Sequence, residues 1–147
     1  MRSLNLGAGN SILVGFDNHD FKKHRDEIDI VFDLDKFPYP ILDNTYNNVR
    51  AIDVLEHLEN PLEAVNEIHR ILKPNGVFFA KCCGWKNPNF WVDITHKKAF
   101  DINSMDYLDI DTDLGKQYDY YTDRKWKILL KVEDRNKNPQ FKMKKIG

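Results

Sequence analysis

The sequence contains few cysteines, and the two that it has are adjacent. Cys82 and Cys83 are the only cysteines in 147 residues. Neighbouring cysteines rarely form a structural disulfide, because the bond requires a particular Cα separation and side-chain direction. A secreted, disulfide-stabilised framework is therefore excluded, and we expect a reduced, cytoplasmic protein.

Long apolar runs and an excess of charge are also lacking. No stretch approaches the ~20 apolar residues that a transmembrane helix needs. The chain enters a strand-like pattern within a few residues of Met1, so we expect no signal peptide. The net charge of −1 gives no general attraction to nucleic acid or to an anionic membrane. With 41% hydrophobic and 31% charged residues, the composition is typical of a single globular domain over residues 1–147.

A third absence concerns the connection between the first two predicted strands. Short apolar runs predict strands over residues 3–6 and 12–16, with only residues 7–11 between them. A parallel crossover normally takes a dozen or more residues and includes a helix, so we expect this helix to be missing or minimal. Dinucleotide sites hold a pyrophosphate at the N-terminus of that helix. The sequence therefore disfavours NAD and favours an adenosine cofactor without phosphate.

What the sequence does contain at this point is a glycine turn followed by a carboxylate. The first predicted strand ends in Gly7-Ala8-Gly9, and the second ends in Asp17. Glycine has no Cβ, so the chain can turn sharply and a ligand can approach the backbone. A carboxylate after the second strand is the usual partner of ribose hydroxyls. The two features together predict a nucleoside-binding site.

The middle of the chain predicts a strand–helix–strand unit. Apolar runs predict strands over residues 30–32, 49–54 and 77–80. Asn60-Pro61 places an N-cap residue and a proline at the start of a helix, and Lys73–Gly76 ends it. This order predicts parallel pairing with a right-handed crossover.

The C-terminal part predicts a β-hairpin. Strands are expected over residues 125–132 and 140–146, with an Asn-Lys-Asn-Pro turn between them. Such a turn between two apolar runs is typical of antiparallel pairing. The whole chain is therefore expected to be an α/β protein with a mostly parallel sheet and an antiparallel C-terminal hairpin.

These motifs occur together in the class I S-adenosylmethionine-dependent methyltransferases, and the sequence resembles their type 11-like members with a shortened first crossover. The resemblance implies a Rossmann-like methyltransferase fold and S-adenosylmethionine as the cofactor. It extends over roughly residues 3–108 and rests on six segments: Leu4–Gly9, Asp17, Asp33-Leu34, Asp53–Leu58, Glu67–Gly76 and Asp93–Lys97.

The resemblance also implies which residues contact the cofactor. Gly7 and Gly9 are expected against its methionine part, Asp17 at the ribose hydroxyls, Asp33 beside the adenine amine and Asp53 near the sulfonium. The full set of expected cofactor-binding residues is Asn5, Gly7, Ala8, Gly9, Asp17, Asp33, Leu34 and Asp53.

Two polar pairs are candidates for the chemistry. Asp93 and His96 are the predicted catalytic pair, since a neutral histidine can take a proton from an acceptor near neutral pH. The alternative is that their segment only folds over the cofactor as a lid. Glu56-His57 is either an active-site pair or the structural start of the helical region. A metal site of His57, Asp93 and His96 has suitable ligand types, but the spacing matches no metal motif and no metal is predicted.

The aromatic segment with Trp85, Phe90 and Trp91 leaves two interpretations open. The three rings either bound an acceptor pocket, or they cover the sheet or form the contact of a homodimer. For the whole protein we expect methyl transfer by in-line displacement to an unidentified acceptor, most simply a small molecule. The alternative is a non-catalytic cofactor-binding module that acts through a partner. A nicotinamide-dependent enzyme is a third, weaker interpretation, and no nucleic-acid or membrane partner is expected.

Overall fold

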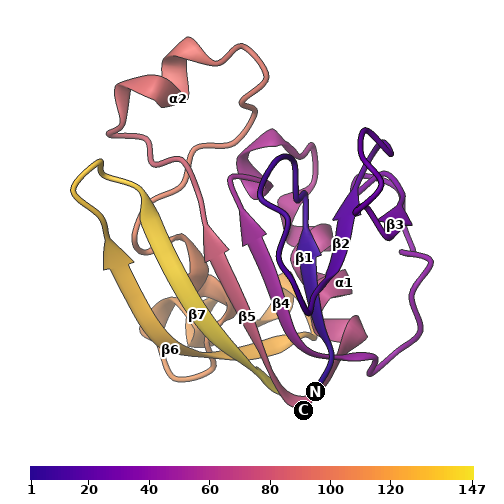
Figure 1. Cartoon of the computed structure of the whole chain (residues 1–147). Coiled ribbons are helices and arrows are strands. Elements are labelled where there is room, and N and C mark those ends of the chain that lie inside the picture. The colour runs from indigo at the N-terminus through magenta and orange to yellow at the C-terminus, as the bar shows by residue number, and fades with distance from the viewer.

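The computed structural model describes residues 1–147 and contains one mixed seven-stranded sheet (Figure 1). The strand order is β3-β2-β1-β4-β5-β7-β6. Strands β1 to β5 are parallel, whereas β7 is antiparallel to both of its neighbours. The strands are β1 Ser3–Leu6, β2 Asp17–Asp20, β3 Ile30–Val31, β4 Tyr46–Ile52, β5 Leu72–Lys81, β6 Lys125–Glu133 and β7 Pro139–Ile146.

Helical structure is sparse, and α1 is the longest helix. The helical segments are η1 Leu55–His57, α1 Pro61–Ile71, α2 Pro88–Val92, η2 Ser104–Leu108, α3 Asp113–Gln117 and η3 Asp119–Tyr121, where η denotes a 3₁₀ helix. None of them has the length and apolar character that crossing a membrane requires.

The predicted fold class is confirmed. Strand β1 has the predicted bounds, β4, α1 and β5 form the parallel unit, and β6 and β7 form the antiparallel hairpin. The α1 N-cap also forms as predicted, because Asn60 Oδ1 accepts a hydrogen bond from the Glu63 N–H at 3.1 Å.

Two boundaries inside the parallel unit differ from the prediction. Helix α1 ends at Ile71 and β5 begins at the next residue, so the predicted helix stop over residues 73–76 lies within the strand. Strand β4 begins earlier than predicted and ends before Asp53, whose φ of +56° breaks the extended conformation.

The connection between β1 and β2 has no helix, as expected. In the parallel register, Leu4 pairs with Asp17 and Asn5 pairs with Asn18. The chain must therefore return from the end of β1 to the level of Leu4 before β2 can begin. Residues 7–16 form this returning connection, and they pass in front of β1 in Figure 1.

The prediction that residues 12–16 form the second strand is wrong. Val14 is 99% exposed, and the strand is instead the polar stretch Asp17–Asp20. Asn18 fixes the loop, because its Oδ1 accepts from the Leu13 N–H at 3.0 Å and its Nδ2 donates to the Leu13 carbonyl at 3.1 Å. The apolar run is thus a loop tied to a polar strand.

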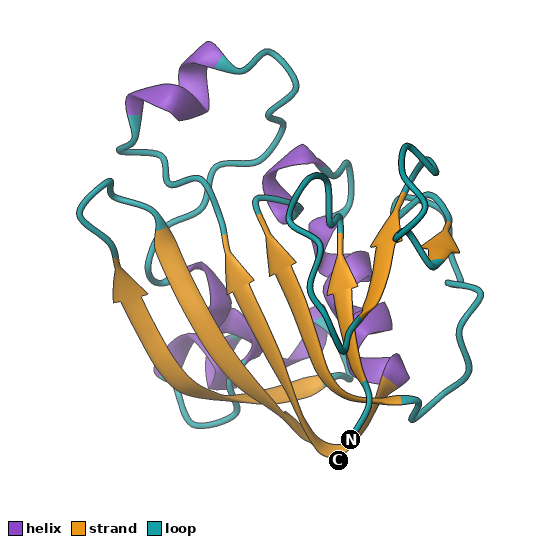
Figure 2. Cartoon of the chain, viewed as in Figure 1, coloured by secondary structure: helices purple, strands orange, loops and turns teal.

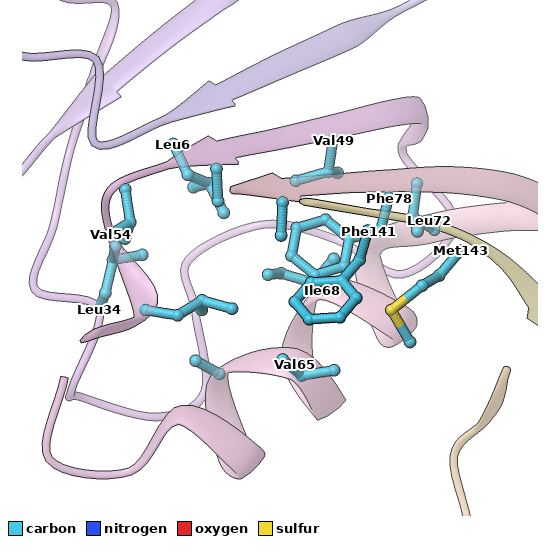
Figure 3. Close-up of a cluster of buried hydrophobic side chains, with 14 of the residues drawn as sticks. Leu6, Leu34, Val49, Val54, Val65, Ile68, Leu72, Phe78, Phe141 and Met143 are labelled. Atoms are coloured by element: carbon cyan, nitrogen blue, oxygen red, sulfur yellow. The ribbon is translucent and has the colours of Figure 1, made fainter. Parts of the chain in front are cut away.

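The hydrophobic core lies between α1 and one face of the sheet. Val65 and Ile68 of α1 point toward Phe78 of β5, with Phe141 and Met143 of β7 beside them (Figure 3). All five side chains are buried. Because α1 joins two strands that pair with each other, the apolar face that holds the helix also fixes β4 against β5.

The other face of the sheet carries no helix. In Figure 2 the helices that pack on the sheet lie behind it, and α2 lies beyond the upper ends of the strands. Along β4, Arg50 and Ile52 alternate with the buried Val49 and Ala51, and both remain partly exposed on the uncovered face. Because the first helix is missing, helices cover one face of the sheet and the other face is partly exposed to solvent.

The loop of residues 7–16 depends on Asn18, so Asn18→Ala should destabilise the fold. The substitution leaves the Leu13 backbone groups and the buried Asn5 amide without their partner, which should lower the free energy of unfolding by about 1–3 kcal/mol. Urea denaturation measures the change. Asn136→Ala, at an exposed asparagine, is the matched control and should change stability by less than about 0.5 kcal/mol. Equal stability of the two variants would contradict this role of Asn18.

Candidate functional site

A cleft of about 420 Å³ opens where β1 to β4 reach their carboxyl ends. This volume is within the range of small-molecule sites, roughly 300–1,000 Å³, and open α/β sheets bind their ligands at this edge. The lining residues are Gly7, Gly9, His19, Asp20, Phe21, Asp33, Leu34, Asp53, Val54, His57 and Leu58.

The glycine turn forms one wall of the cleft. Gly7 and Gly9 have φ angles of +60° and +53°, in the left-handed region that favours glycine. A Cβ on Gly7 would also lie 2.5 Å from the Val54 Cγ2 atom. Conformation and space therefore both require glycine at position 7.

Strand β2 accepts all three N–H groups of this turn. The Gly7 N–H donates to His19 Nδ1 at 3.2 Å, the Ala8 N–H to the His19 carbonyl at 2.8 Å, and the Gly9 N–H to Asp20 Oδ2 at 2.8 Å. Phosphate-binding turns instead leave such N–H groups free to point at the anion. The turn in this protein has no free N–H to offer to a phosphate.

His19 is held as a neutral ring. Since Nδ1 accepts from Gly7, the proton must be on Nε2, which donates to the Phe32 carbonyl at 2.9 Å. Burial lowers the pKa of His19 and outweighs the opposing influence of the Phe32 carbonyl and Asp20. The neutral ring therefore links the glycine turn to the end of β3 through two hydrogen bonds.

Asp20 is the carboxylate at the end of the second strand. Its Oδ2 accepts from the Gly9 N–H and from His24 Nε2 at 3.1 Å, and its Oδ1 accepts from the Phe21 N–H at 2.8 Å. Burial by itself would raise the pKa of Asp20, but the hydrogen bonds from His24 and from the two N–H groups hold the pKa below its usual value. The side chain stays ionised and lines the cleft.

The structure does not bring Asp17 to the cleft. It is the first residue of β2, at the opposite end from Asp20, and its Oδ2 accepts from Arg2 Nε at 2.9 Å and from the Tyr46 hydroxyl at 2.8 Å. The sequence-based assignment put Asp17 after a strand that does not exist. Asp20 was not predicted from the sequence because β2 is polar. The signal that could have found it is the length of chain that a parallel second strand needs to return to the start of the first strand.

The other predicted cofactor-binding residues fall into two groups. Gly7, Gly9, Asp33, Leu34 and Asp53 line the cleft, and their contact with a cofactor stays a prediction. Asn5 and Ala8 are buried and are not among the lining residues. The Asn5 amide instead donates to the Ser11 carbonyl at 2.9 Å and to Asn18 Oδ1 at 3.0 Å, so its contacts serve the loop.

The predicted catalytic pair, Asp93 and His96, does not line the cleft. Asp93 Oδ2 is 3.5 Å from His96 Nε2, and His96 Nδ1 lies 2.9 Å from the Phe90 carbonyl. His57, by contrast, lines the cleft. The Thr95 hydroxyl joins the two regions, because it donates to Asp93 Oδ1 at 2.6 Å and contacts His57 Nδ1 at 2.9 Å.

Glu56 holds the segment that follows β5. Its side chain is completely buried, and its Oε1 accepts from the Cys83 N–H at 2.9 Å. Its carbonyl accepts from the N–H groups of Lys97 and Lys98. Burial raises the pKa of Glu56. A donor atom of Glu56 lies close to donor atoms of His57 and His96, so these three residues could hold a metal ion.

The aromatic segment does not bound the cleft. Trp85 and Trp91 are 49% and 72% exposed, Phe90 is buried in the α2 region, and none of the three lines the cleft. Trp85 Nε1 donates to Asp101 Oδ2 at 2.8 Å. Helix α2 lies above the upper ends of the strands in Figure 1, away from the uncovered sheet face. The sheet-cover interpretation is therefore wrong, whereas the acceptor-pocket and dimer-contact interpretations stay predictions.

Comparison with known proteins finds a family model that matches part of the chain. Residues 13–80 match the model of the methyltransferase domain family. The sequence matches no curated protein in this comparison. The chain has the class I S-adenosylmethionine-dependent methyltransferase fold. The resemblance seen in the sequence is thereby confirmed, and these matches support S-adenosylmethionine as the cofactor.

Solved structures share the fold of this chain. A proposed methyltransferase in complex with the Haloferax volcanii Trm112 methyltransferase activator has a TM-score of 0.68 and 14% identity, covering 98% of this chain and 81% of that one. An S-adenosylmethionine-dependent methyltransferase from Thermotoga maritima has a TM-score of 0.65 and 12% identity, covering 99% and 82%. A cyclase has a TM-score of 0.60 and 14% identity, covering 99% and 75%.

Because His19 is buried and neutral, the stability of this protein should fall at acidic pH. The folded pKa of His19 is lowered, so below the unfolded value of about 6.5 the unfolded chain binds a proton that the folded chain does not. The free energy of unfolding therefore keeps its full value above that pH. Below that pH it falls, by at most ~1.4 kcal/mol per pH unit for one group. Urea denaturation between pH 7.5 and 5.5 should give a shallower pH dependence for His19→Gln. The same slope for both proteins would contradict the assignment.

Asp20 rather than Asp17 should control cofactor binding. Asp20→Asn removes the charge at the end of β2 and should weaken S-adenosylhomocysteine at least 10-fold, measured by calorimetry. Asp17→Asn is the matched control, and it should bind within a factor of about two of the unchanged protein because it lies at the other end of the strand. The reverse ranking would contradict the placement of the ribose.

Proposed function

We propose that this protein transfers a methyl group from S-adenosylmethionine to an acceptor. The observation that carries the proposal is the ionised Asp20 at the end of β2, bonded to the glycine turn in a cleft at the strand ends. S-adenosylmethionine supplies an electrophilic methyl group on a sulfonium. The chain supplies a site for a nucleoside that has no phosphate.

Charge in the cleft supports this choice of cofactor. Asp20, Asp33 and Asp53 line it, and no lysine or arginine does. Three carboxylates favour a ligand that carries a sulfonium and an ammonium group and disfavour a pyrophosphate. The N–H groups of residues 7–9 are all engaged, which also argues against NAD.

Each wall of the cleft has a role in the proposed complex. Asp20 would accept the ribose hydroxyls, and Asp33 with Leu34 would flank the adenine. Gly7 and Gly9 would allow the methionine part to approach the backbone, because no side chain projects from them. Asp53 and the residues after it would border the methyl group.

The chemistry would depend mainly on alignment. Holding donor and acceptor in line can contribute roughly 7–11 kcal/mol to catalysis. Asp93 and Thr95 act on the cleft through His57, whose Nδ1 contacts the Thr95 hydroxyl. We therefore assign Thr95 a positioning role. Asp93 and His96 are proposed to act as the catalytic pair where an acceptor must also lose a proton, and a small-molecule acceptor is favoured.

A second candidate function is a cofactor-binding module that acts through a protein partner. It is favoured by the β1–β2 connection, which lacks a helix, and by the Haloferax protein, which is in complex with an activator. The difference between the two candidates is turnover in the absence of another protein.

Binding followed by turnover tests both candidates. S-adenosylmethionine or S-adenosylhomocysteine at ~100-fold over Kd should stabilise the protein by about 2.7 kcal/mol, and NAD should not. With cofactor labelled in the methyl group and a small-molecule extract, we expect label in the extract and formation of S-adenosylhomocysteine. Asp20→Asn is the control for binding-dependent transfer.

Three outcomes separate the possibilities. Binding without transfer contradicts the enzyme and supports the module. No stabilisation by either sulfur compound contradicts both. Stabilisation by NAD in preference to them would support the nicotinamide-dependent enzyme instead.

A further inference from the structure

Three metal-ligand side chains meet at the border of the cleft. Glu56 and His57 belong to η1, and His96 comes from the segment after α2, yet one donor atom of each lies within 4.8 Å of the others. The rings of His57 and His96 have centroids 4.7 Å apart. The juxtaposition is set by the backbone, because the N–H of Lys97, next to His96, donates to the Glu56 carbonyl at 2.7 Å.

Glu56 has a buried oxygen without a partner. The residue is 0% exposed, Oε1 accepts from the Cys83 N–H, and Oε2 has no hydrogen-bond partner. Leaving a buried polar atom unpaired costs about 1–3 kcal/mol, and more for a charged group. A cation would supply the missing partner.

Both histidines are oriented by a hydrogen bond at Nδ1. His96 Nδ1 lies 2.9 Å from the Phe90 carbonyl, which can only accept, so Nδ1 carries the proton. The Thr95 hydroxyl donates to Asp93, so it accepts from His57 Nδ1 at 2.9 Å. The Nε2 atom of each ring is then free of a proton in the neutral form. Metal-binding histidines are held in this way, with the second nitrogen donating to a carbonyl, a carboxylate or another acceptor.

We propose that Glu56, His57 and His96 form a binding site for a divalent cation of the zinc class. Two imidazole nitrogens and one carboxylate oxygen are the ligand set of one group of zinc enzymes, in which a fourth position stays open. Ligand atoms around tetrahedral zinc are about 3.3 Å apart for bonds of about 2.0–2.1 Å. The three ligand atoms lie within 4.8 Å of one another and would move closer together on binding zinc.

Charge and position suit this site. Asp93 accepts two hydrogen bonds from Thr95, and its Oδ2 lies 3.5 Å from His96 Nε2. Two carboxyl groups, those of Glu56 and Asp93, therefore lie at the site. Since His57 also lines the cleft, the cation would lie at the border of the proposed cofactor site and would join η1 to the segment after α2.

Metal titration without any cofactor tests the site. Chelator-stripped protein should bind one Co²⁺ per chain with the visible absorption of a tetrahedral complex, and Zn²⁺ should displace it. Glu56→Gln, which keeps an acceptor for the Cys83 N–H, and His96→Gln should each weaken Zn²⁺ at least 100-fold. His24→Gln removes a histidine outside the cluster and should not change the stoichiometry or the affinity.

Thr95→Val keeps the test informative if a buried variant fails to fold. Thr95 is exposed, so its replacement leaves the core unchanged, and it should weaken Zn²⁺ about 10–100-fold by releasing the His57 ring. Failure of the unchanged protein to bind Zn²⁺ or Co²⁺, or binding that Glu56→Gln and His96→Gln leave unaltered, would overturn the proposal. S-adenosylhomocysteine binding is measured separately, so either result leaves the proposed function independently testable.

Discussion

The structure depends on how the chain returns from β1 to β2. Two parallel neighbours must begin at the same edge of the sheet, and residues 7–16 are just enough to bring the chain back. No length remains for a helix, so the loop is held by hydrogen bonds instead of by an apolar helix face. Asn5 and Asn18 supply these bonds from β1 and β2.

The same constraint shapes the proposed cofactor site. In a dinucleotide fold the first helix offers free N–H groups to a phosphate, whereas here His19 and Asp20 accept the N–H groups of the turn. Both side chains therefore stabilise the turn, and both line the cleft. The carboxylate that closes the turn also faces the cleft, and the site is suited to a cationic, phosphate-free nucleoside. The loss of the helix also leaves the second sheet face uncovered (Figure 2).

Much of the fold could be predicted because its elements carry an apolar pattern or a cap. Helix α1 has an N-cap and one apolar face, and the β6–β7 hairpin has two alternating runs around a turn. Strand β2 could not be found in this way, because its buried residues are Asn18, His19 and Asp20. Hydrogen bonds compensate their burial, and a hydrophobicity pattern does not reveal such bonds. The strand was therefore predicted at the apolar residues 12–16 instead.

The site was predictable to the extent that it follows local motifs. Gly7, Gly9, Asp33 and Asp53 line the cleft because each follows a strand that the sequence located correctly or nearly so. The meeting of Glu56 with His96 depends on a backbone contact across some forty positions of the chain, which no spacing rule contains. The aromatic segment could not be placed in this way, since its composition suggested either a pocket wall or a sheet cover and the structure places α2 beyond the strand ends (Figure 1).

We propose that a polar strand end, not a helix, holds the adenosine of the cofactor. A crystal structure with S-adenosylhomocysteine would show where the ribose binds. We expect the ribose hydroxyls within hydrogen-bond distance of Asp20 and the β1–β2 loop with its bonds to Asn18 unchanged. A ribose bound at Asp17, or a ligand placed outside the cleft of Gly7 and Asp20, would rule out this mode of binding.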